Sequence, residues 1–146
     1  MIAIDKASWH SGAADFPADL DPQAGGTHIG FLLTWLINSN LMSDTFDSAA
    51  IADVEARRKT GREILFDVCD YTLKNEDLSE VGKKFVEDYY NADDRDKSGN
   101  NWYLDNYERT LADDLPSMYH VEDSWENYDL IEPVIDAAYD HWRLSD

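Results

Sequence analysis

Two histidines near the start of the chain are the first residues whose types suggest chemistry. His10 follows Trp9 in ASWHSG, and His28 stands at the beginning of the most apolar segment, THIGFLLTWLI. A neutral imidazole serves as a general base or a metal ligand, so this pair with nearby acids would suit a small hydrolase. A histidine beside an apolar run is more often hydrogen-bonded and structural, and the sequence contains no H-E-x-x-H pair. We therefore expect structural roles for His10 and His28, with no catalytic residue and no cofactor.

A second candidate is the acidic segment DRDKSGNNWYLD, residues 94–105, which partly matches a calcium-binding EF-hand loop. Such a loop has oxygen ligands at its first, third, fifth and twelfth positions, which here are Asp94, Asp96, Ser98 and Asp105. However, Trp102 occupies the usually polar ninth position, and the last ligand is aspartate instead of the longer glutamate. A solvated acidic loop is the preferred interpretation, and the metal site stays a weak candidate.

The third candidate is MYHVEDSWENYD, residues 118–129, where aromatic and acidic residues are interleaved. Aromatic rings supply contact area and cation–π interactions, and carboxylates complement a surface rich in lysine or arginine. The alternative is that Trp125 and Tyr128 anchor the last helix on the core. The predicted partner-binding residues are Asp113, Asp114, Glu122, Asp123, Trp125, Glu126, Tyr128 and Asp129.

The composition limits the possible partners. The chain has 12 Lys and Arg against 31 Asp and Glu, a net charge of −19. Binding to nucleic acid or to an anionic membrane requires clustered basic residues, so neither is expected, whereas a basic protein would be attracted. The single cysteine, Cys69, excludes an internal disulfide and fits a reducing compartment. With no apparent signal peptide and no apolar run long enough to span a bilayer, we expect a cytoplasmic protein.

The elements that must position these residues are predominantly helical. Residues 1–146 suffice for one domain, in which residues 1–26 form an irregular lead-in whose Trp9 packs on the core. A central buried helix follows, capped by Thr27 and containing Trp35. No convincing strand pattern appears, so we predict an all-α domain of five or six helices. A short helix is expected to begin at Ser48 and to be terminated by Gly61, and the next should begin at the TGRE capping box of Thr60 and run through Tyr71. Two further helices are expected over Leu78–Tyr89 and Leu104–Leu111. The last helix should begin at about Asp129, with Pro133 in its first turn.

The chain also resembles a family of small bacterial proteins through ASWH, FP, DL and AG-THIG, which fall at Ala7–His10, Phe16–Pro17, Asp19–Leu20 and Ala24–Gly30. The likeness continues through YLDNY at residues 103–107 and DSWENYD at residues 123–129. Members of that family look like immunity proteins of polymorphic toxin or type VI secretion systems. The resemblance therefore implies an antitoxin that is no enzyme and that occludes a cognate toxin, such as a basic nuclease acting in the cytosol. The alternatives are the hydrolase that uses His10 and His28, and an acidic mimic of DNA.

Overall fold

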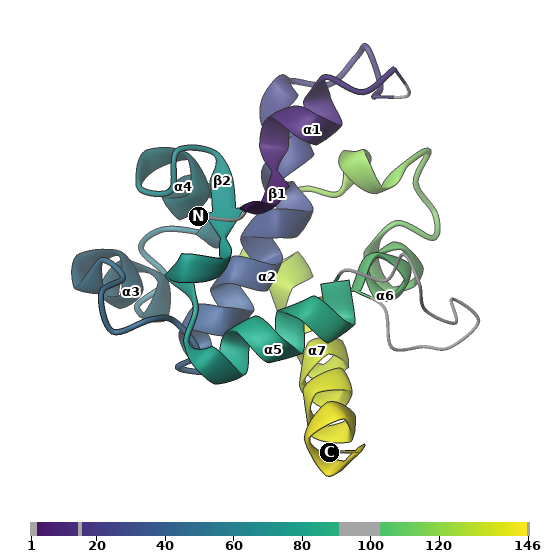
Figure 1. Ribbon diagram of the computed structural model, residues 1–146. Coiled ribbons are helices and arrows are strands. Elements are labelled where there is room, and N and C mark those ends of the chain that lie inside the picture. The colour runs from purple at the N-terminus through teal and green to yellow at the C-terminus, as the bar shows by residue number, and fades with distance from the viewer. Residues whose placement is uncertain (1–2, 15, 91–102, 146) are drawn as a thin grey trace.

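The computed structural model describes residues 3–14, 16–90 and 103–145 (Figure 1). Within these ranges the chain forms seven α-helices and one pair of strands, which confirms the predicted all-α class. The helices are α1 (Ala7–Ser11), α2 (Thr27–Asn38), α3 (Ser48–Glu55), α4 (Gly61–Asp67), α5 (Glu80–Tyr90), α6 (Tyr103–Leu111) and α7 (Trp125–Ser145). The strands are β1 (Ala3–Lys6) and β2 (Thr72–Lys74), and the short 3-10 turns are η1 (Pro22–Gly26), η2 (Asn75–Asp77) and η3 (Met118–His120).

Helix α2 runs through the middle of the molecule, with the other helices around it (Figure 1). Every residue from Thr27 to Ile37 is buried, as expected for a segment that is apolar nearly all round. Each fully buried leucine contributes about 1.5–3 kcal/mol, so α2 is a main source of stability. Thr27 is the first helical residue and not the cap, because Gly26 takes the cap position. The Thr27 hydroxyl instead accepts a hydrogen bond of 3.1 Å from Arg62.

Helix α4 packs on α2 through two glycines. A Cβ on Gly30 would meet the Arg62 backbone nitrogen at 2.5 Å, so the two helices touch backbone to backbone. The Gly61 amide donates to the Thr34 hydroxyl at 3.0 Å across the same contact. The predicted capping box is confirmed, with Thr60 and Glu63 each accepting a hydrogen bond from the other's backbone amide. The local cap and the close glycine contact together fix where α4 begins.

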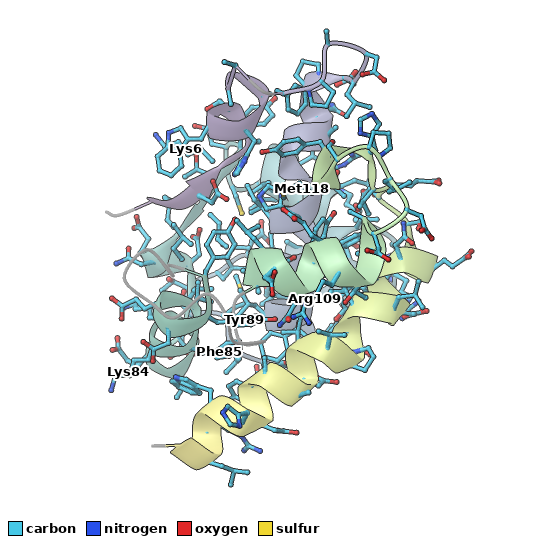
Figure 2. All side chains as sticks on the ribbon, turned by 90° about the vertical axis from the view of Figure 1, so that its right-hand side faces the viewer. Lys6, Lys84, Phe85, Tyr89, Arg109 and Met118 are labelled. Atoms are coloured by element: carbon cyan, nitrogen blue, oxygen red, sulfur yellow. The ribbon has the colours of Figure 1, made fainter. Side chains whose placement is uncertain are left out.

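The aromatic core lies between α2, α5, α6 and α7. On α5, Phe85 and Tyr89 face the interior, whereas Lys84 points outward (Figure 2). Trp35 of α2 is buried as expected, and its indole N–H donates to Asp136 of α7 at 2.8 Å. This contact fixes α7 against the central helix.

Helix α7 begins earlier than predicted, at Trp125, because the Ser124 hydroxyl caps it by accepting from the Asn127 amide at 3.2 Å. Pro133 consequently lies inside the helix and not in its first turn. A proline there has no amide hydrogen to donate to the carbonyl four residues earlier, that of Asp129. The cap and the packing of the buried face outweigh this loss.

Two other helix ends differ from the predictions. Helix α3 ends at Glu55, and Arg57 then adopts a left-handed conformation with φ 59°, so Gly61 does not terminate it. Helix α4 ends at Asp67, and Tyr71 is a left-handed, exposed turn residue with φ 63°. The left-handed residues at these two turns are not glycines, so neither turn could be recognised from residue type.

The lead-in contains more regular secondary structure than predicted. Strand β1 pairs antiparallel with β2, with Asp5 opposite Leu73 and an irregularity between Ala3 and Asp5. Helix α1 follows at once, and the Ala7 amide donates to the Tyr71 carbonyl at 3.0 Å. Strands of four and three residues are too short to display an alternating pattern, which is why they were missed. Among the described residues, no helix combines the length and apolar character needed to cross a membrane.

Candidate functional site

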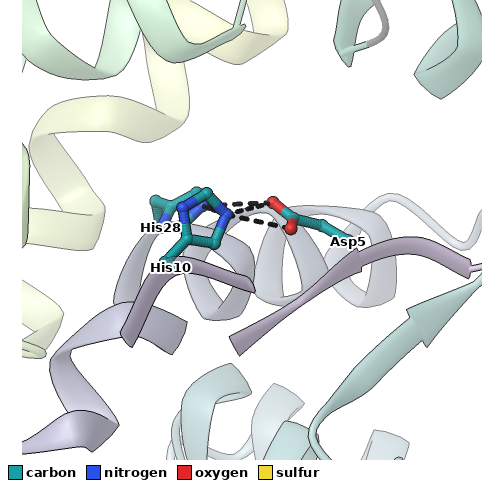
Figure 3. Close-up of side chains that lie close together, drawn as sticks. All are labelled: Asp5, His10 and His28. Atoms are coloured by element: carbon teal, nitrogen blue, oxygen red, sulfur yellow. Dashed lines mark hydrogen bonds and ion pairs between the residues drawn. The ribbon is translucent and has the colours of Figure 1, made fainter. Parts of the chain in front are cut away.

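Asp5, His10 and His28 come together where β1, α1 and α2 meet (Figure 3). Asp5 belongs to the strand, and α1 follows directly and carries His10. His28 is the second residue of α2, and the preceding turn η1 packs tightly on α1. A Cβ on Gly25 of that turn would lie 2.8 Å from the Ala7 carbonyl oxygen, so the chain needs a glycine there. We call these three residues the Asp5–His10–His28 cluster.

The ring nitrogens and the carboxylate of the cluster form a small triangle. His10 Nε2 lies 2.8 Å from Asp5 Oδ2 and 2.9 Å from Asp5 Oδ1. His28 Nε2 lies 3.3 Å from Asp5 Oδ2 and 3.2 Å from His10 Nε2. Through one ring nitrogen, His28 of the central helix thus contacts both Asp5 of β1 and His10 of α1. The group in the lead-in that both histidines contact is the side-chain carboxylate of Asp5.

Tyrosines surround the cluster. The Tyr119 hydroxyl lies 2.8 Å from His10 Nδ1, and the Tyr90 hydroxyl donates to Asp5. The Tyr103 hydroxyl donates to the backbone carbonyl of His28 at 2.5 Å. His28 Nδ1 is buried and has no hydrogen-bond partner among the residues that the structure describes. Asp5 and His10 are therefore each held from outside by a phenol, whereas the His28 ring is positioned by packing and by its Nε2 contacts.

The environment favours an ionised Asp5 and an uncharged His28. Burial by itself would raise the pKa of Asp5, but hydrogen bonds from both histidines outweigh it and hold that pKa well below its usual range. Burial lowers the pKa of His28, although its hydrogen bond to Asp5 acts in the opposite direction. A carboxylate and a neutral imidazole are the protonation states in which these groups bind metals.

The cluster is almost closed to solvent. The side chains of His28 and Asp5 are 1% and 6% exposed, and that of His10 is 18% exposed. A hollow lies beside it, between α1 and the turn after α4, and its lining includes Lys6, Ser8 and Tyr71 but no member of the cluster. Because the cluster does not line this hollow, a substrate bound there would not meet the imidazoles.

Trp9 does not pack on the core, and the prediction that it does so is wrong. Its side chain is 54% exposed, and the Lys6 ammonium lies 5.5 Å from its ring centroid. Helix α1 is little more than one turn long, and successive residues of a helix point in different directions. When His10 faces the interior, the adjacent Trp9 therefore faces solvent. Phe16 is half-buried, and its ring centroid lies 5.0 Å from that of Tyr119.

Trp125 and Asp129, two of the predicted partner-binding residues, already contact an arginine of the same chain, Arg57. Arg57 donates to Asp129 through both terminal nitrogens, at 2.6 and 3.2 Å, and its guanidinium lies 4.6 Å from the Trp125 ring centroid. The hydrogen bond from Arg57 lowers the pKa of Asp129. The chemistry predicted for a partner's arginine at Trp125 and Asp129 is thus supplied by the chain itself.

Two further members are not surface residues, which corrects the expectation for them. Tyr128 is 1% exposed and packs in the core, with Asn38 donating to its hydroxyl at 3.3 Å. Asp123 has a 5% exposed side chain, accepts from Thr60 at 2.8 Å and pairs with Arg62 at 3.3 Å. An acidic segment suggests exposure, but the burial of Tyr128 and Asp123 is decided by the side of the chain that packs on the core and by partners distant in the sequence.

The remaining predicted interface residues, Asp113, Asp114, Glu122 and Glu126, are exposed. None of them forms an ion pair with any residue in the described part of the chain. We call Glu122 and Glu126, which flank Trp125 in the sequence, the acidic pair. Their carboxylates are open to a cation from outside the chain.

Of the EF-hand candidates, Asp94, Asp96 and Ser98 lie outside the described residues. Asp105 is the third residue of α6, where it pairs with Arg109 at 3.1 Å. Cys69 is buried, and burial raises the pKa of its thiol to about 12. The Asp105 carboxylate thus has a partner within α6, and the Cys69 thiol stays protonated at neutral pH.

Sequence reasoning missed Asp5, Tyr90 and Tyr119 as parts of the site. Asp5 is one of 31 acids and precedes His10 by five residues, which is no recognised metal or catalytic spacing. The two tyrosines lie 85 and 109 residues from their partners in the sequence. Only the fold brings these groups together.

Comparison with known proteins places the chain in a family without assigning an activity. A family model described as a domain of unknown function, DUF7832, matches residues 3–121. That range contains the whole Asp5–His10–His28 cluster and ends before Glu122. No curated protein and no solved structure matches the chain. The matched segment is most of the 146 residues, so the chain belongs to the DUF7832 family.

Proposed function

We propose that this protein is an antitoxin of the immunity type, which binds a cognate secreted toxin and occludes it. The observation that carries the proposal is the acidic pair, Glu122 and Glu126, exposed on either side of Trp125 on a chain of net charge −19. The resemblance to immunity proteins of polymorphic toxin or type VI secretion systems supports the same role. An immunity protein of this kind would act in the cytoplasm, where its toxin acts.

The charge distribution supports a basic partner. Arg57 and Arg62 neutralise Asp129 and Asp123 within the fold, which leaves the acidic pair to attract cations from outside. Opposite charges on the two proteins accelerate encounter, and a nuclease toxin with a positive cleft would present the complementary surface. Recognition by occlusion requires no catalytic residue in the antitoxin.

One observation favours a second candidate, a small hydrolase that uses His10 and His28. The fold does bring both imidazoles to a carboxylate, as general acid–base chemistry would require. Against it, His28 is 1% exposed and the neighbouring hollow is lined by other residues. An enzyme needs its reacting groups within reach of substrate, so we rank this candidate second.

The test is binding to the protein encoded beside this one, measured by surface plasmon resonance with the charge-reversed variant Glu122→Lys/Glu126→Lys. We expect stable association of the wild-type protein and an association rate constant about tenfold lower for the variant at low salt. The difference should shrink in about 1 M salt, where the screening length is about 3 Å.

The matched control is Asp44→Lys/Glu76→Lys, which reverses two exposed acids on other elements and gives the same net charge. If only the first variant loses association rate, the acidic pair is the contact. Equal losses in both variants would mean that net charge alone steers the partner and would remove the proposed surface. No association of the wild-type protein with its neighbour's product would remove the antitoxin proposal.

A further inference from the structure

The Asp5–His10–His28 cluster has the dimensions of a zinc site. Its three donor atoms, Asp5 Oδ2, His10 Nε2 and His28 Nε2, are separated by 2.8, 3.2 and 3.3 Å. Neighbouring ligands around a tetrahedral zinc ion are about 3.3 Å apart, because zinc lies about 2.0–2.1 Å from nitrogen and oxygen. An ion about 1 Å out of the plane of this triangle would be about 2 Å from all three atoms. We propose that Asp5, His10 and His28 bind one divalent transition metal ion, and that this ion is zinc.

Hydrogen bonds alone cannot satisfy this triangle. The ionised Asp5 is only an acceptor, so each histidine Nε2 must carry a proton to bond to it. Two protonated nitrogens then face each other at 3.2 Å, which is a donor–donor contact. Moving either proton to Nδ1 turns the contact with Asp5 into one between two acceptors. A single cation removes the conflict, since it accepts a lone pair from all three atoms at once.

The surroundings of two ligands are those of a metal site. A metal-bound histidine usually donates its other ring N–H to an oxygen, and a bound carboxylate usually accepts a further hydrogen bond. His10 Nδ1 has the Tyr119 hydroxyl at 2.8 Å, and Asp5 accepts from Tyr90. Tyr119 thus holds the His10 ring through Nδ1, and Tyr90 holds the Asp5 carboxylate through Oδ2.

The donor set and the burial define the class of ion and its role. Two imidazoles and one carboxylate suit zinc, cobalt or ferrous iron, whereas calcium and magnesium prefer oxygen ligands. Asp5, His10 and His28 come from β1, α1 and α2, so one ion would join β1 and α1 to the central helix. Because the unfolded chain has no preformed site, the binding energy would add to the stability of the fold.

The experiment uses the full chain without a histidine tag, stripped with a chelator and then titrated with Zn²⁺ by isothermal calorimetry. We expect one equivalent to bind and the melting temperature to rise, with no rise from Mg²⁺ or Ca²⁺. The variants His10→Ala and Asp5→Asn should each weaken binding at least about 100-fold, more than loss of an outer hydrogen-bond partner does. His141→Ala, which removes an exposed histidine of α7, is the matched control and should bind zinc as the wild type does.

A second measurement needs no variant. Co²⁺ added to the wild-type chain should give the intense visible absorption of a site with low coordination number, and Zn²⁺ should displace it. A folded wild-type chain that takes up no zinc, or a cobalt spectrum identical to that of the free aqueous ion, overturns the proposal. Unchanged zinc binding in folded His10→Ala and Asp5→Asn overturns it as well. These results are independent of partner binding, so the zinc site and the antitoxin role can fail separately.

Discussion

Gly61 lies against Gly30 with no room for a side chain, because a Cβ on Gly61 would stand 2.0 Å from the Gly30 carbonyl oxygen. The same Cβ would stand 2.3 Å from the Thr34 hydroxyl. Helices α2 and α4 can keep this spacing only while residue 61 is a glycine.

We therefore expect Gly61→Ala to lower the free energy of unfolding by about 3 kcal/mol, since the clash is with backbone and the helices must separate. Urea denaturation followed by circular dichroism measures this. Val68→Ala, at the exposed end of the same helix, should change it by only about 0.5 kcal/mol. Equal effects of the two substitutions would show that the glycine contact is not tight.

Asp123 should make stability depend on pH. Burial raises its pKa above the ordinary 3.8, although Thr60 and Arg62 partly offset this. The folded chain therefore binds the Asp123 proton more tightly than the unfolded chain does, and this residue lowers stability as the pH rises from about 4 to its raised pKa. Asp123→Asn has no such proton, so its stability relative to the wild type should increase over that interval.

The measurement for Asp123 is urea denaturation of both proteins at a series of pH values. The control is Glu122→Gln, which removes an exposed negative charge next to Asp123. It shows how much of the effect comes from losing a negative charge in general and how much from losing the buried carboxylate. A stability difference for Asp123→Asn that stays flat or falls with pH would contradict the assignment.

Cys69 should be inert while the chain is folded. Its thiol is buried and has a pKa of about 12, so little thiolate is present at pH 8 and reagents cannot reach it. We expect the folded protein to react with a chromogenic disulfide about 1,000-fold more slowly than the urea-unfolded chain. Rapid reaction of the folded protein would show that this part of the core opens readily.

Tyr119 should tune the proposed zinc site without being a ligand. Tyr119→Phe removes the hydrogen-bond partner of His10 Nδ1 and should weaken zinc binding about tenfold. Tyr139→Phe, a change of the same kind in the aromatic cluster with Trp35 and Phe85, should leave zinc binding unchanged. If both variants bind zinc like the wild type, Tyr119 has no part in positioning His10.

Local patterns in the sequence predicted the helical class, the central helix and the capping box at Thr60. These features depend on residues within a few positions of one another, so periodicity and capping chemistry reveal them. Helix ends at left-handed Arg57 and Tyr71 were not predictable, because both are residues for which that conformation is uncommon.

The candidate sites depended on contacts between distant residues. Residue type singled out His10 and His28, but their shared partner Asp5 has no local signature. Likewise, nothing near Asp129 in the sequence indicates that Arg57, 72 residues earlier, will pair with it. Residue type identified the groups with potential chemistry, whereas only the tertiary structure decided which of them are available to a ligand.

The contact between His10 and Tyr119 has a consequence for the order of folding. The two residues are 109 positions apart in the sequence, and the hydrogen-bond partner of Asp5, Tyr90, follows it by 85 positions. Contacts of such long sequence separation are slow to form, and on a ribosome they cannot form until the second residue has emerged. The contacts around the cluster are therefore completed only after Tyr119 has been synthesised, so Asp5 and His10 reach their final positions later than many residues that follow them in the sequence.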